Sequence, residues 1–144
     1  MEELKRHFIT SDREYREGEV FVYEQKFTVK DVKKAVFTAT ALGVYEAEIN
    51  GVKIGKQMFA PGYSYYPRRV LYQTYEVSAL LREGANTLRV YLGQGWYCGR
   101  FLCENKTQIY GEKPAVSWIL KIEDAAGVRD IVSGDAEDRT GISY

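Results

Sequence analysis

Hydrophobic residues recur at every second position along most of this chain. In one of the clearest runs, Tyr45, Ala47 and Ile49 alternate with two glutamates. A period of two places the hydrophobic side chains on one face of a β-strand. Runs of this kind occupy residues 20–29 (Val20, Val22, Phe27, Val29), 35–39, 44–49, 52–54, 70–77, 87–92, 116–122 and 128–132. The sequence therefore predicts an all-β chain.

Turn signals separate these runs. Asn50-Gly51 between two alternating runs indicates a tight hairpin. Residues 55–69 contain Pro61-Gly62 and Pro67, which favour an ordered loop. Residues 78–84 predict one helical turn, with Ser78 as the N-cap and Gly84 in the left-handed terminating conformation. About eight short strands and one short helical turn indicate an antiparallel β-sandwich, because a barrel or a βαβ fold needs uniform strand spacing or intervening helices.

The length of 144 residues fits one domain. We expect residues 1–19 to be a polar leader and residues 20–144 a single β-sandwich domain. Residues 141–144 only begin another apolar run, so we expect a fragment truncated at the C-terminal end of a longer multidomain chain.

Charge excludes several classes of partner. The 20 basic and 20 acidic residues cancel, and such a chain has no field that would attract nucleic acid. Residues 1–7 carry charges where a secretory signal has an apolar core, and no apolar run approaches the ~20 residues of a membrane span. We expect no nucleic-acid or membrane partner and, as the sequence stands, a cytoplasmic location.

The residue inventory also limits the chemistry. The single histidine, His7, lies in the polar leader, which argues against a nucleophilic triad. Cys98 and Cys103 have no second cysteine pair to complete a zinc site, so we expect free thiols.

Glu46 and Glu48 share one strand face about 7 Å apart, the arrangement that could serve a glycosidase. They lie opposite the apolar face, however, and we expect them to be solvated. No catalytic residue and no metal ligand is predicted.

The chain holds twelve tyrosines, and five of them fall within thirteen residues. Tyrosine combines a flat apolar face with a hydroxyl group, which suits a sugar and equally a partly wet protein interface. Tyr45, Tyr72, Tyr75 and Tyr91 lie in expected strands, where we expect cross-strand packing. The loop aromatics Tyr63, Tyr65, Tyr66, Trp96 and Tyr97 lie among Gly and Pro, where functional sites concentrate.

A third interpretation of these loops is a nucleic-acid surface. Arg68, Arg69, Arg100 and Lys106 would then form a basic rim beside the aromatic residues. The neutral net charge favours the sugar and the protein interpretations over this one.

Several segments resemble a known family in their order and spacing. They are 41–51 (ALGVYEAEING), 52–55 (VKIG), 60–63 (APGY), 72–75 (YQTY), 77–81 (VSALL), 84–86 (GAN), 92–97 (LGQGWY), 99–100 (GR) and 140–142 (TGI). Over roughly residues 20–144 the sequence resembles the N-terminal domain of bacterial α-L-rhamnosidases of glycoside hydrolase family 78. The resemblance implies a jelly-roll sandwich of the galactose-binding-domain type.

The resemblance also implies a role. In that family several β-domains precede an (α/α) barrel whose acidic residues hydrolyse terminal α-L-rhamnosides with inversion, and this chain holds none of that barrel. It would be a non-catalytic accessory domain that assists substrate recognition or binds carbohydrate such as L-rhamnose or rhamnosides. The alternative is a purely structural domain that docks on the barrel and has no sugar site of its own; in both cases the other domains of the parent enzyme are partners.

Some domains of this type bind rhamnose with the help of calcium, through loops near the Asn-Gly turn and the Gly-Trp-Tyr segment. The candidate carbohydrate-binding residues are accordingly Asn50, Tyr63, Gln94, Trp96, Tyr97 and Arg100, provided that the hairpin and the Gly-rich loop meet at one end of the sandwich. Calcium prefers six or more oxygen ligands, and Cys98 beside Tyr97 is a soft ligand. We expect no cofactor, with calcium as the alternative.

Overall fold

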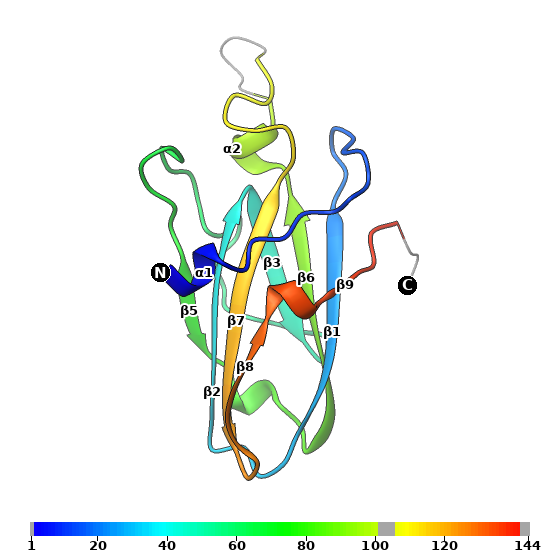
Figure 1. Ribbon diagram of the computed structural model, residues 1–144, viewed down its shortest axis with the longest axis vertical. Helices are drawn as coiled ribbons and strands as arrows, with labels where there is room; N and C mark the ends of the chain where they lie inside the picture. The colour runs from blue at the N-terminus through cyan, green and yellow to red at the C-terminus, as the bar shows by residue number, and fades with distance from the viewer. Residues whose placement is uncertain (1, 101–105, 142–144) are drawn as a thin grey trace.

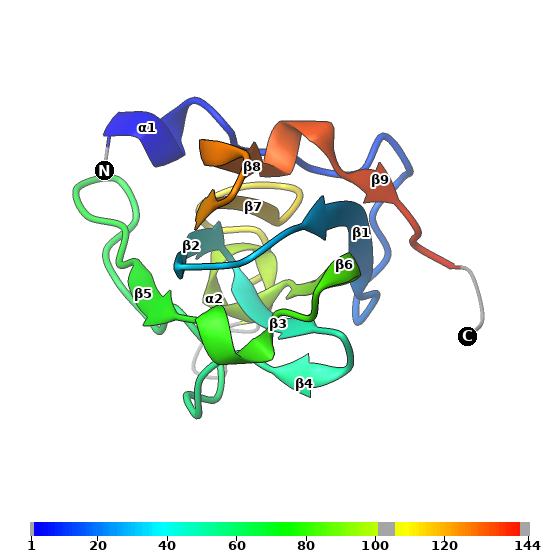
Figure 2. The same cartoon turned by 90° about the horizontal axis from the view of Figure 1, so that it is seen from below.

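The computed structural model describes residues 2–100 and 106–141, and the alternating runs form two antiparallel sheets in it. The strands are β1 (Phe21–Val29), β2 (Lys34–Leu42), β3 (Val44–Ile49), β4 (Val52–Lys53), β5 (Gln73–Glu76), β6 (Gly84–Gly93), β7 (Ala115–Asp124), β8 (Gly127–Val132) and β9 (Glu137–Asp138). One sheet has the order β4-β3-β6-β1-β9 and the other β5-β2-β7-β8. The two layers are visible end-on in Figure 2 and confirm the predicted all-β sandwich.

The core lies between the sheets. Val116, Trp118, Leu120 and Ile122 of β7 are fully buried, as their alternation predicts. Trp118 meets Tyr23 of the facing sheet with ring centroids 6.1 Å apart. The large side chains of β7 thus fill the space between the layers.

In the first half of β1 the residues that face the core are the odd-numbered ones, not the even-numbered ones that the sequence pattern predicted. The pattern singled out Val20 and Val22, but Phe21 and Tyr23 are buried and Val20 is exposed. Phe21 pairs with Leu92 and Tyr23 with Val90, two buried residues of β6. Because paired residues point to the same face of a sheet, the rings follow their partners into the core.

The hairpin at Asn50-Gly51 is confirmed. It joins β3 to β4, and both turn residues have positive φ, +52° and +80°, as a two-residue type I′ turn requires. Tyr45, Ala47 and Ile49 face the core as predicted.

The helical segments are short. They are the α-helical turns α1 (Glu2–Lys5) and α2 (Gly95–Cys98) and the 3₁₀ turns at Ser78–Leu80 and Ser133–Asp135. The predicted turn at 78–84 is therefore only partly helical, and Ser78 does not cap it: its Oγ accepts a hydrogen bond from the Ala35 N–H at 2.7 Å. Gly84, with φ +84°, begins β6 instead of ending a helix. Across the described ranges, no helix has the length and apolar character needed to cross a membrane.

Residues 2–19, the expected polar leader, lie against the sandwich (Figure 1). Leu4 is buried, and its carbonyl oxygen accepts a hydrogen bond from Ser117 Oγ at 2.6 Å. Ile9 pairs with Val116 as an isolated β-bridge, which extends the four-stranded sheet beside β7. The Tyr15 ring packs edge-on against Phe21. The leader is therefore in contact with both the sheet and the core.

Candidate functional site

Three segments gather at one end of the sandwich, the upper end in Figure 1. They are residues 10–19, residues 55–72, and residues 95–100 with 106–114. The turn after β1, the 3₁₀ turn at 78–80 and Asn50 lie at the other end. The loop aromatics predicted from the sequence all belong to the first end.

Seven aromatic side chains at this end form one connected cluster, which we call the aromatic platform. Its members are Phe59, Tyr63, Tyr65, Tyr66, Trp96, Tyr97 and Tyr110. Tyr66 lies at its centre, with ring centroids 5.1 Å from Tyr97, 5.1 Å from Tyr110 and 6.3 Å from Tyr63. Trp96 joins through Tyr63 at 6.1 Å and Phe59 at 6.5 Å. The structure thus brings together Tyr63, Trp96 and Tyr97 of the candidate set.

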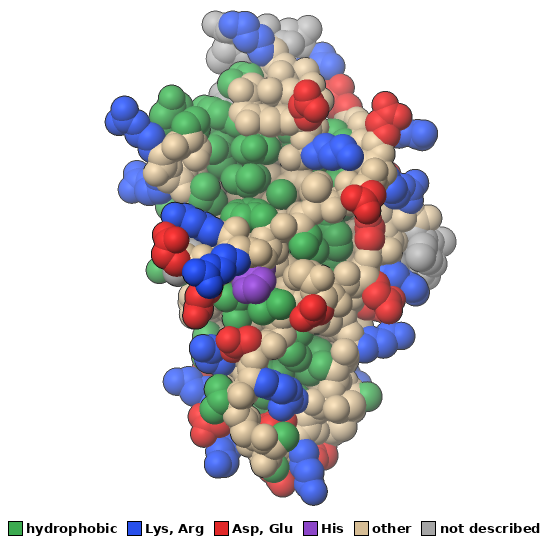
Figure 3. Space-filling view, in the orientation of Figure 1, with side chains coloured by type: hydrophobic (Ala, Val, Ile, Leu, Met, Phe, Trp, Pro, Cys, Tyr) green, Lys and Arg blue, Asp and Glu red, His purple; other side chains and the backbone are tan. Residues whose placement is uncertain are grey.

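The outer rings of the platform are exposed although they contact one another. The exposed fractions are 60% for Phe59, 50% for Tyr63, 56% for Tyr65 and 39% for Trp96, whereas Tyr66 beneath them is only 8% exposed. In Figure 3 hydrophobic side chains form a broad area in the upper half of the face shown. An exposed group of aromatic side chains of this kind is a candidate for a binding surface.

Hydrogen bonds fix the segment that carries four of these rings. Its Ala60-Pro61 peptide bond is cis. The Ala60 carbonyl accepts from the Tyr45 N–H at 2.6 Å, and the Pro61 carbonyl accepts from Gln73 Nε2 at 3.1 Å. The loop is therefore ordered, as its Pro and Gly content predicts, and it holds its aromatic side chains in place.

The turn α2 positions Trp96 and Tyr97. It starts at Gly95, which has φ +50° and approaches Val44 so closely that a Cβ would lie 2.8 Å from the valine side chain. The Tyr97 carbonyl accepts a hydrogen bond from the Tyr110 N–H at 3.3 Å, and the two rings stack. Gly111 leaves room for Tyr97, because a Cβ there would lie 2.4 Å from its ring.

The environment of the platform raises the pKa values of two of its hydroxyl groups, those of Tyr66 and Tyr110. Burial raises the pKa of Tyr66 to about 12, and its hydroxyl has no partner among the described residues. The Tyr63 and Tyr110 hydroxyls lie 3.2 Å apart, and this contact raises the pKa of Tyr110. The platform offers uncharged rings edged by hydroxyl groups.

Gln94 and Arg100 lie beside the platform and contact the 10–19 segment. Gln94 Oε1 accepts hydrogen bonds from the Tyr15 hydroxyl and from the Gly18 N–H. Arg100 pairs with Glu17 at 3.2 Å. The two side chains line a small pocket of about 140 Å³, separate from the exposed rings.

The described side chains at this end do not form a calcium site. Within residues 2–100 and 106–141, no three His, Cys, Asp or Glu side chains gather as a metal site. Cys98 is buried, and burial raises its pKa to about 11, so the group beside Tyr97 is a protonated thiol. Calcium needs several oxygen ligands, including carboxylates. Cys103 lies outside the described residues, as do residues 142–144.

Asn50 is not brought to the platform. It lies at the opposite end of β3 from Val44, and its Nδ2 donates to Leu80 O at 3.1 Å and to Asn86 Oδ1 at 2.8 Å. Its Oδ1 accepts from the Thr87 N–H at 3.0 Å. The hairpin and the Gly-rich loop therefore do not meet, and the amide of Asn50 joins the hairpin turn to residues 80–87.

Two platform residues, Phe59 and Tyr110, were not singled out from the sequence. Both lie in loops near Gly or Pro, the same signal that identified the other loop aromatics. Three of the four tyrosines expected to pack on strands do so: Tyr45 is buried, and Tyr75 and Tyr91 are half-buried. Tyr72, in contrast, precedes β5 and is exposed.

The carboxylate pair on β3 faces away from the core, as predicted. Glu46 forms an ion pair with Lys53 at 2.7 Å. Glu48 contacts Arg89 at 3.5 Å and accepts a hydrogen bond from the Tyr91 hydroxyl at 3.2 Å. Both carboxylates are therefore part of an ion-paired outer sheet face.

Comparisons with known proteins agree on one family. A family model described as the alpha-L-rhamnosidase N-terminal domain matches residues 30–143. An alpha-L-rhamnosidase of Streptomyces avermitilis is 43% identical over 113 residues, which cover 78% of this chain and 11% of that protein. The chain spans about a tenth of the length of the curated relatives it matches.

Solved structures give the same result. Native alpha-L-rhamnosidase from Aspergillus terreus superposes with a TM-score of 0.83 at 32% identity, covering 94% of this chain and 16% of that one. The Streptomyces avermitilis alpha-L-rhamnosidase complexed with L-rhamnose gives a TM-score of 0.78 at 39% identity, covering 85% of this chain and 12% of that one.

Proposed function

Because this chain belongs to the family of alpha-L-rhamnosidase N-terminal domains, we propose that it is a non-catalytic accessory domain of an alpha-L-rhamnosidase whose aromatic platform binds carbohydrate. The parent enzyme hydrolyses terminal α-L-rhamnosides in its other domains, and this domain holds the glycan. The platform carries the proposal: four exposed rings fixed over the buried Tyr66.

The chemistry of the platform suits a sugar. A pyranose presents C–H groups on its faces and hydroxyls on its edges, and an aromatic face with a hydroxyl at its rim complements both. Tyr63 and Trp96 are the ring faces in this proposal, and Tyr97 contacts the ring of Tyr66, which packs against Tyr63. Gln94 and Arg100 stand at the margin. One solved relative is an alpha-L-rhamnosidase complexed with L-rhamnose, which supports L-rhamnose as the first probe.

An NMR titration of the chain with L-rhamnose tests the proposal. Trp96 is exposed and Trp118 fully buried, so the Trp96 indole signal should shift with saturation while the Trp118 signal serves as an internal reference. The same titration with calcium and then with chelator should give equal affinities. The absence of saturable shifts at high sugar concentration would contradict carbohydrate binding.

Variants assign the site. Tyr63→Ala with Trp96→Ala should abolish the shifts, because both removed rings belong to the proposed contact surface. Tyr72→Ala is the matched control: Tyr72 is 49% exposed but lies outside the platform. Unchanged affinity in the double variant would exclude these two residues from the site.

A protein contact is the second candidate function, and Met58 and Phe59 favour it. Both are exposed by 60% or more, and neither side chain carries a strong hydrogen-bonding group for sugar hydroxyls. If the platform docks on the rest of the enzyme, Met58→Ser with Phe59→Ser should make the junction of the full-length enzyme more sensitive to protease. Sugar shifts in the isolated chain should then be absent in the native sequence as well.

A further inference from the structure

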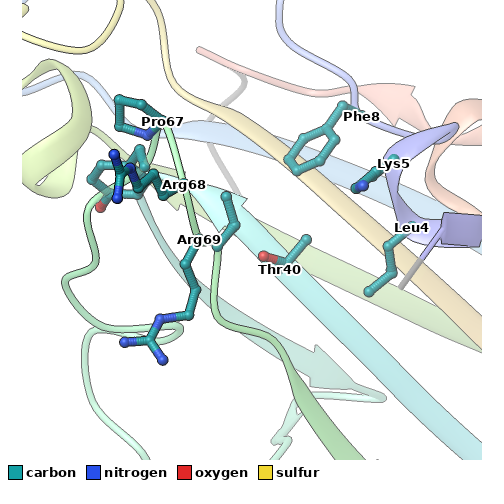
Figure 4. Close-up of a pocket in the computed structure, with 9 residues that line it drawn as sticks. Leu4, Lys5, Phe8, Thr40, Pro67, Arg68 and Arg69 are labelled. Carbon is teal, nitrogen blue, oxygen red and sulfur yellow. The ribbon is translucent and has the colours of Figure 1, made fainter.

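The N-terminal segment approaches the loops of the platform in two places. At the first, residues 4–8 and 66–70 stand on opposite sides of a groove of about 420 Å³ over Thr40 (Figure 4). The guanidinium groups of Arg68 and Arg69 lie apart from each other and point away from this groove. The groove therefore keeps the two segments apart at this place.

At the second place the N-terminal segment is in direct contact with the chain around α2. The Tyr15 hydroxyl and the Gly18 N–H both donate to Gln94 Oε1, the second at 3.3 Å. Glu17 pairs with Arg100 at 3.2 Å. Because Gln94 precedes α2 and Arg100 follows it, one short stretch of the N-terminal segment contacts the chain on both sides of this turn.

The turn α2 depends on support from outside. It spans only Gly95–Cys98, and the Cys98 N–H donates to the Gln94 carbonyl at 3.4 Å. A single helical turn is not stable in isolation, because its first hydrogen bond requires several residues to be fixed at once. Trp96 and Tyr97 belong to this turn, so their positions at the platform follow from the contacts that hold it.

Tyr15 is itself firmly placed. Its ring packs edge-on against the fully buried Phe21, with ring centroids 5.7 Å apart. Burial raises the pKa of its hydroxyl to about 12, so the hydroxyl keeps its proton at neutral pH. The segment is also tied to the end of the 106–114 loop, since Lys113 Nζ donates to the Arg13 carbonyl at 2.8 Å. Gln94 Oε1 is thus bound to a fixed partner.

We infer that Tyr15 is a positioning residue of the carbohydrate site, which acts through Gln94 to hold α2 and the Trp96 ring in the binding arrangement. Gln94 then orients the turn and does not contact the sugar. A ring that is already in place binds more tightly, because less ordering remains for the binding step. The family model starts at residue 30, so this part of the site lies outside the matched region. The inference rests on the carbohydrate-binding role proposed above.

Tyr15→Phe tests the inference, because it removes one hydroxyl and keeps the ring on Phe21. The affinity for L-rhamnose, measured by NMR titration, should fall about fivefold, the factor that corresponds to one ordinary hydrogen bond. In the spectrum without sugar the Trp96 indole signal should move, while the signal of the fully buried Trp118 should stay in place. If Tyr15 only stabilised the fold, both indole signals would keep their native positions.

Tyr91→Phe is the matched control for the loss of a tyrosine hydroxyl. The Tyr91 hydroxyl donates to Glu48 at 3.2 Å on the outer face of the five-stranded sheet, outside the platform. This variant should therefore keep the native affinity for L-rhamnose and the native Trp96 signal. A fall in affinity equal to that of Tyr15→Phe would show that the loss of any such hydroxyl weakens binding, which would overturn the inference.

Substitutions of Gln94 separate positioning from sugar contact. Gln94→Glu keeps an oxygen acceptor for Tyr15 and Gly18 but loses the N–H donors of the amide, and it should retain most of the affinity. Gln94→Met removes the acceptor in a side chain of similar length. It should lower the affinity at least as much as Tyr15→Phe and move the Trp96 signal in the same way.

The outcomes distinguish this inference from the proposed function. If the native chain gives no saturable shifts, carbohydrate binding is overturned, and the role of Tyr15 in it is overturned as well. If the native chain binds L-rhamnose and Tyr15→Phe binds it equally tightly, only this inference is overturned. Loss of affinity in Gln94→Glu together with native affinity in Tyr15→Phe would identify Gln94 as a sugar contact and not as a positioning residue.

Discussion

The two ends of the sandwich use their polar side chains differently. At one end Asn50 and Asn86 direct their amide groups to the chain itself: Asn86 is 2% exposed and bonds to Asn50, to both backbone groups of Arg82 and to the Gly84 carbonyl. We call this the asparagine network. At the other end the platform rings stay exposed, and the hydroxyl of the buried Tyr66 has no partner among the described residues.

The asparagine network should therefore contribute mainly to the stability of the fold, and the platform mainly to ligand binding. A buried amide whose donors and acceptors are all bonded fixes the turns around it, and its loss leaves several backbone groups unpaired. An exposed ring supported from below contributes little to folding but retains its contact surface for a ligand. Asn50 and Tyr63 are both residue types common in sugar sites, yet only Tyr63 lies where a ligand can reach it.

The largest expected effect is on the asparagine network. Asn86→Ala should lower the free energy of unfolding by about 3 kcal/mol, because it empties a buried position and removes the hydrogen-bond partner of Asn50 and of backbone groups of Arg82 and Gly84. Tyr63→Ala with Trp96→Ala should lower it by less than about 1 kcal/mol, since both rings are exposed. Urea unfolding measures both. Similar losses of unfolding free energy in the two variants would contradict the proposed difference between the two ends.

Sugar binding completes that test. Asn86→Ala should bind L-rhamnose with native affinity at temperatures where it is folded, and Asn86→Asp should be no more stable than Asn86→Ala, because its second carboxylate oxygen would face the carbonyl oxygens of Arg82 and Gly84 in a buried position. Impaired binding in a folded Asn86 variant would show that the two ends are coupled.

Gly111→Ala should have the next largest effect, and at the aromatic end. A Cβ at this position would lie 2.4 Å from the Tyr97 ring, so the ring must shift from its stacked position on Tyr110. We expect a loss of about 1–2 kcal/mol in unfolding free energy and weaker sugar binding. Gly134→Ala is the matched control, because nothing lies within 4 Å of its Cβ position. Native sugar affinity in Gly111→Ala would show that the Tyr97 position is not needed.

The sequence predicts the strands better than the site, and the reason is physical. Alternation reports which face of a strand is apolar, so the inward faces of β3 and β7 follow from the sequence alone. In β1 both faces carry apolar residues at the start, and only pairing with Leu92 and Val90 decides that Phe21 and Tyr23 turn inward. The loop aromatics were identified because Gly and Pro interrupt the pattern around them.

The sequence pattern does not predict which residues far apart in the chain come together in space. Asn50 and Gln94 each follow the end of a strand, but those strands are antiparallel neighbours, Val44 pairing with Gly93 and Ile49 with Leu88. The residues after them therefore lie at opposite ends of the sandwich. Likewise, no spacing along the chain indicates that residues 4–8 and 66–70 form one groove.

A smaller effect on the free energy of unfolding should follow from pH. The aromatic end should lose stability at high pH, and the opposite end at low pH. Burial raises the pKa values of Tyr15 and Tyr66 to about 12 from an ordinary 10. Their neutral forms are favoured in the folded state, so this stability is complete below pH 10 and is lost as the pH rises from 10 to 12. We expect a loss on the order of 1 kcal/mol. Thermal unfolding across this range, with a tyrosinate absorbance titration, measures it.

Low pH should reduce stability at the end of the sandwich opposite the platform. Arg129 donates to Asp124 at the close of β7 and holds the pKa of that carboxyl below its ordinary value. This stability is present above pH 3.8 and is lost as the pH falls below it. Asp124→Asn should flatten the acid side of the profile and leave the alkaline side unchanged. A change on the alkaline side would contradict the assignment.

The smallest effect is expected for Tyr66→Phe, which tests the unpartnered hydroxyl directly. Removing a buried hydroxyl that has no partner costs no hydrogen bond, so the free energy of unfolding should change by less than about 0.5 kcal/mol. Tyr45→Phe is the matched control, because the Tyr45 hydroxyl donates to Gln73 Oε1 at 3.0 Å, and it should cost about 1 kcal/mol. Tyr66→Phe should also reduce the alkaline loss of stability. If Tyr66→Phe costs as much as Tyr45→Phe, its hydroxyl is bonded in solution, and the aromatic end would then satisfy its buried polar groups as the asparagine network does.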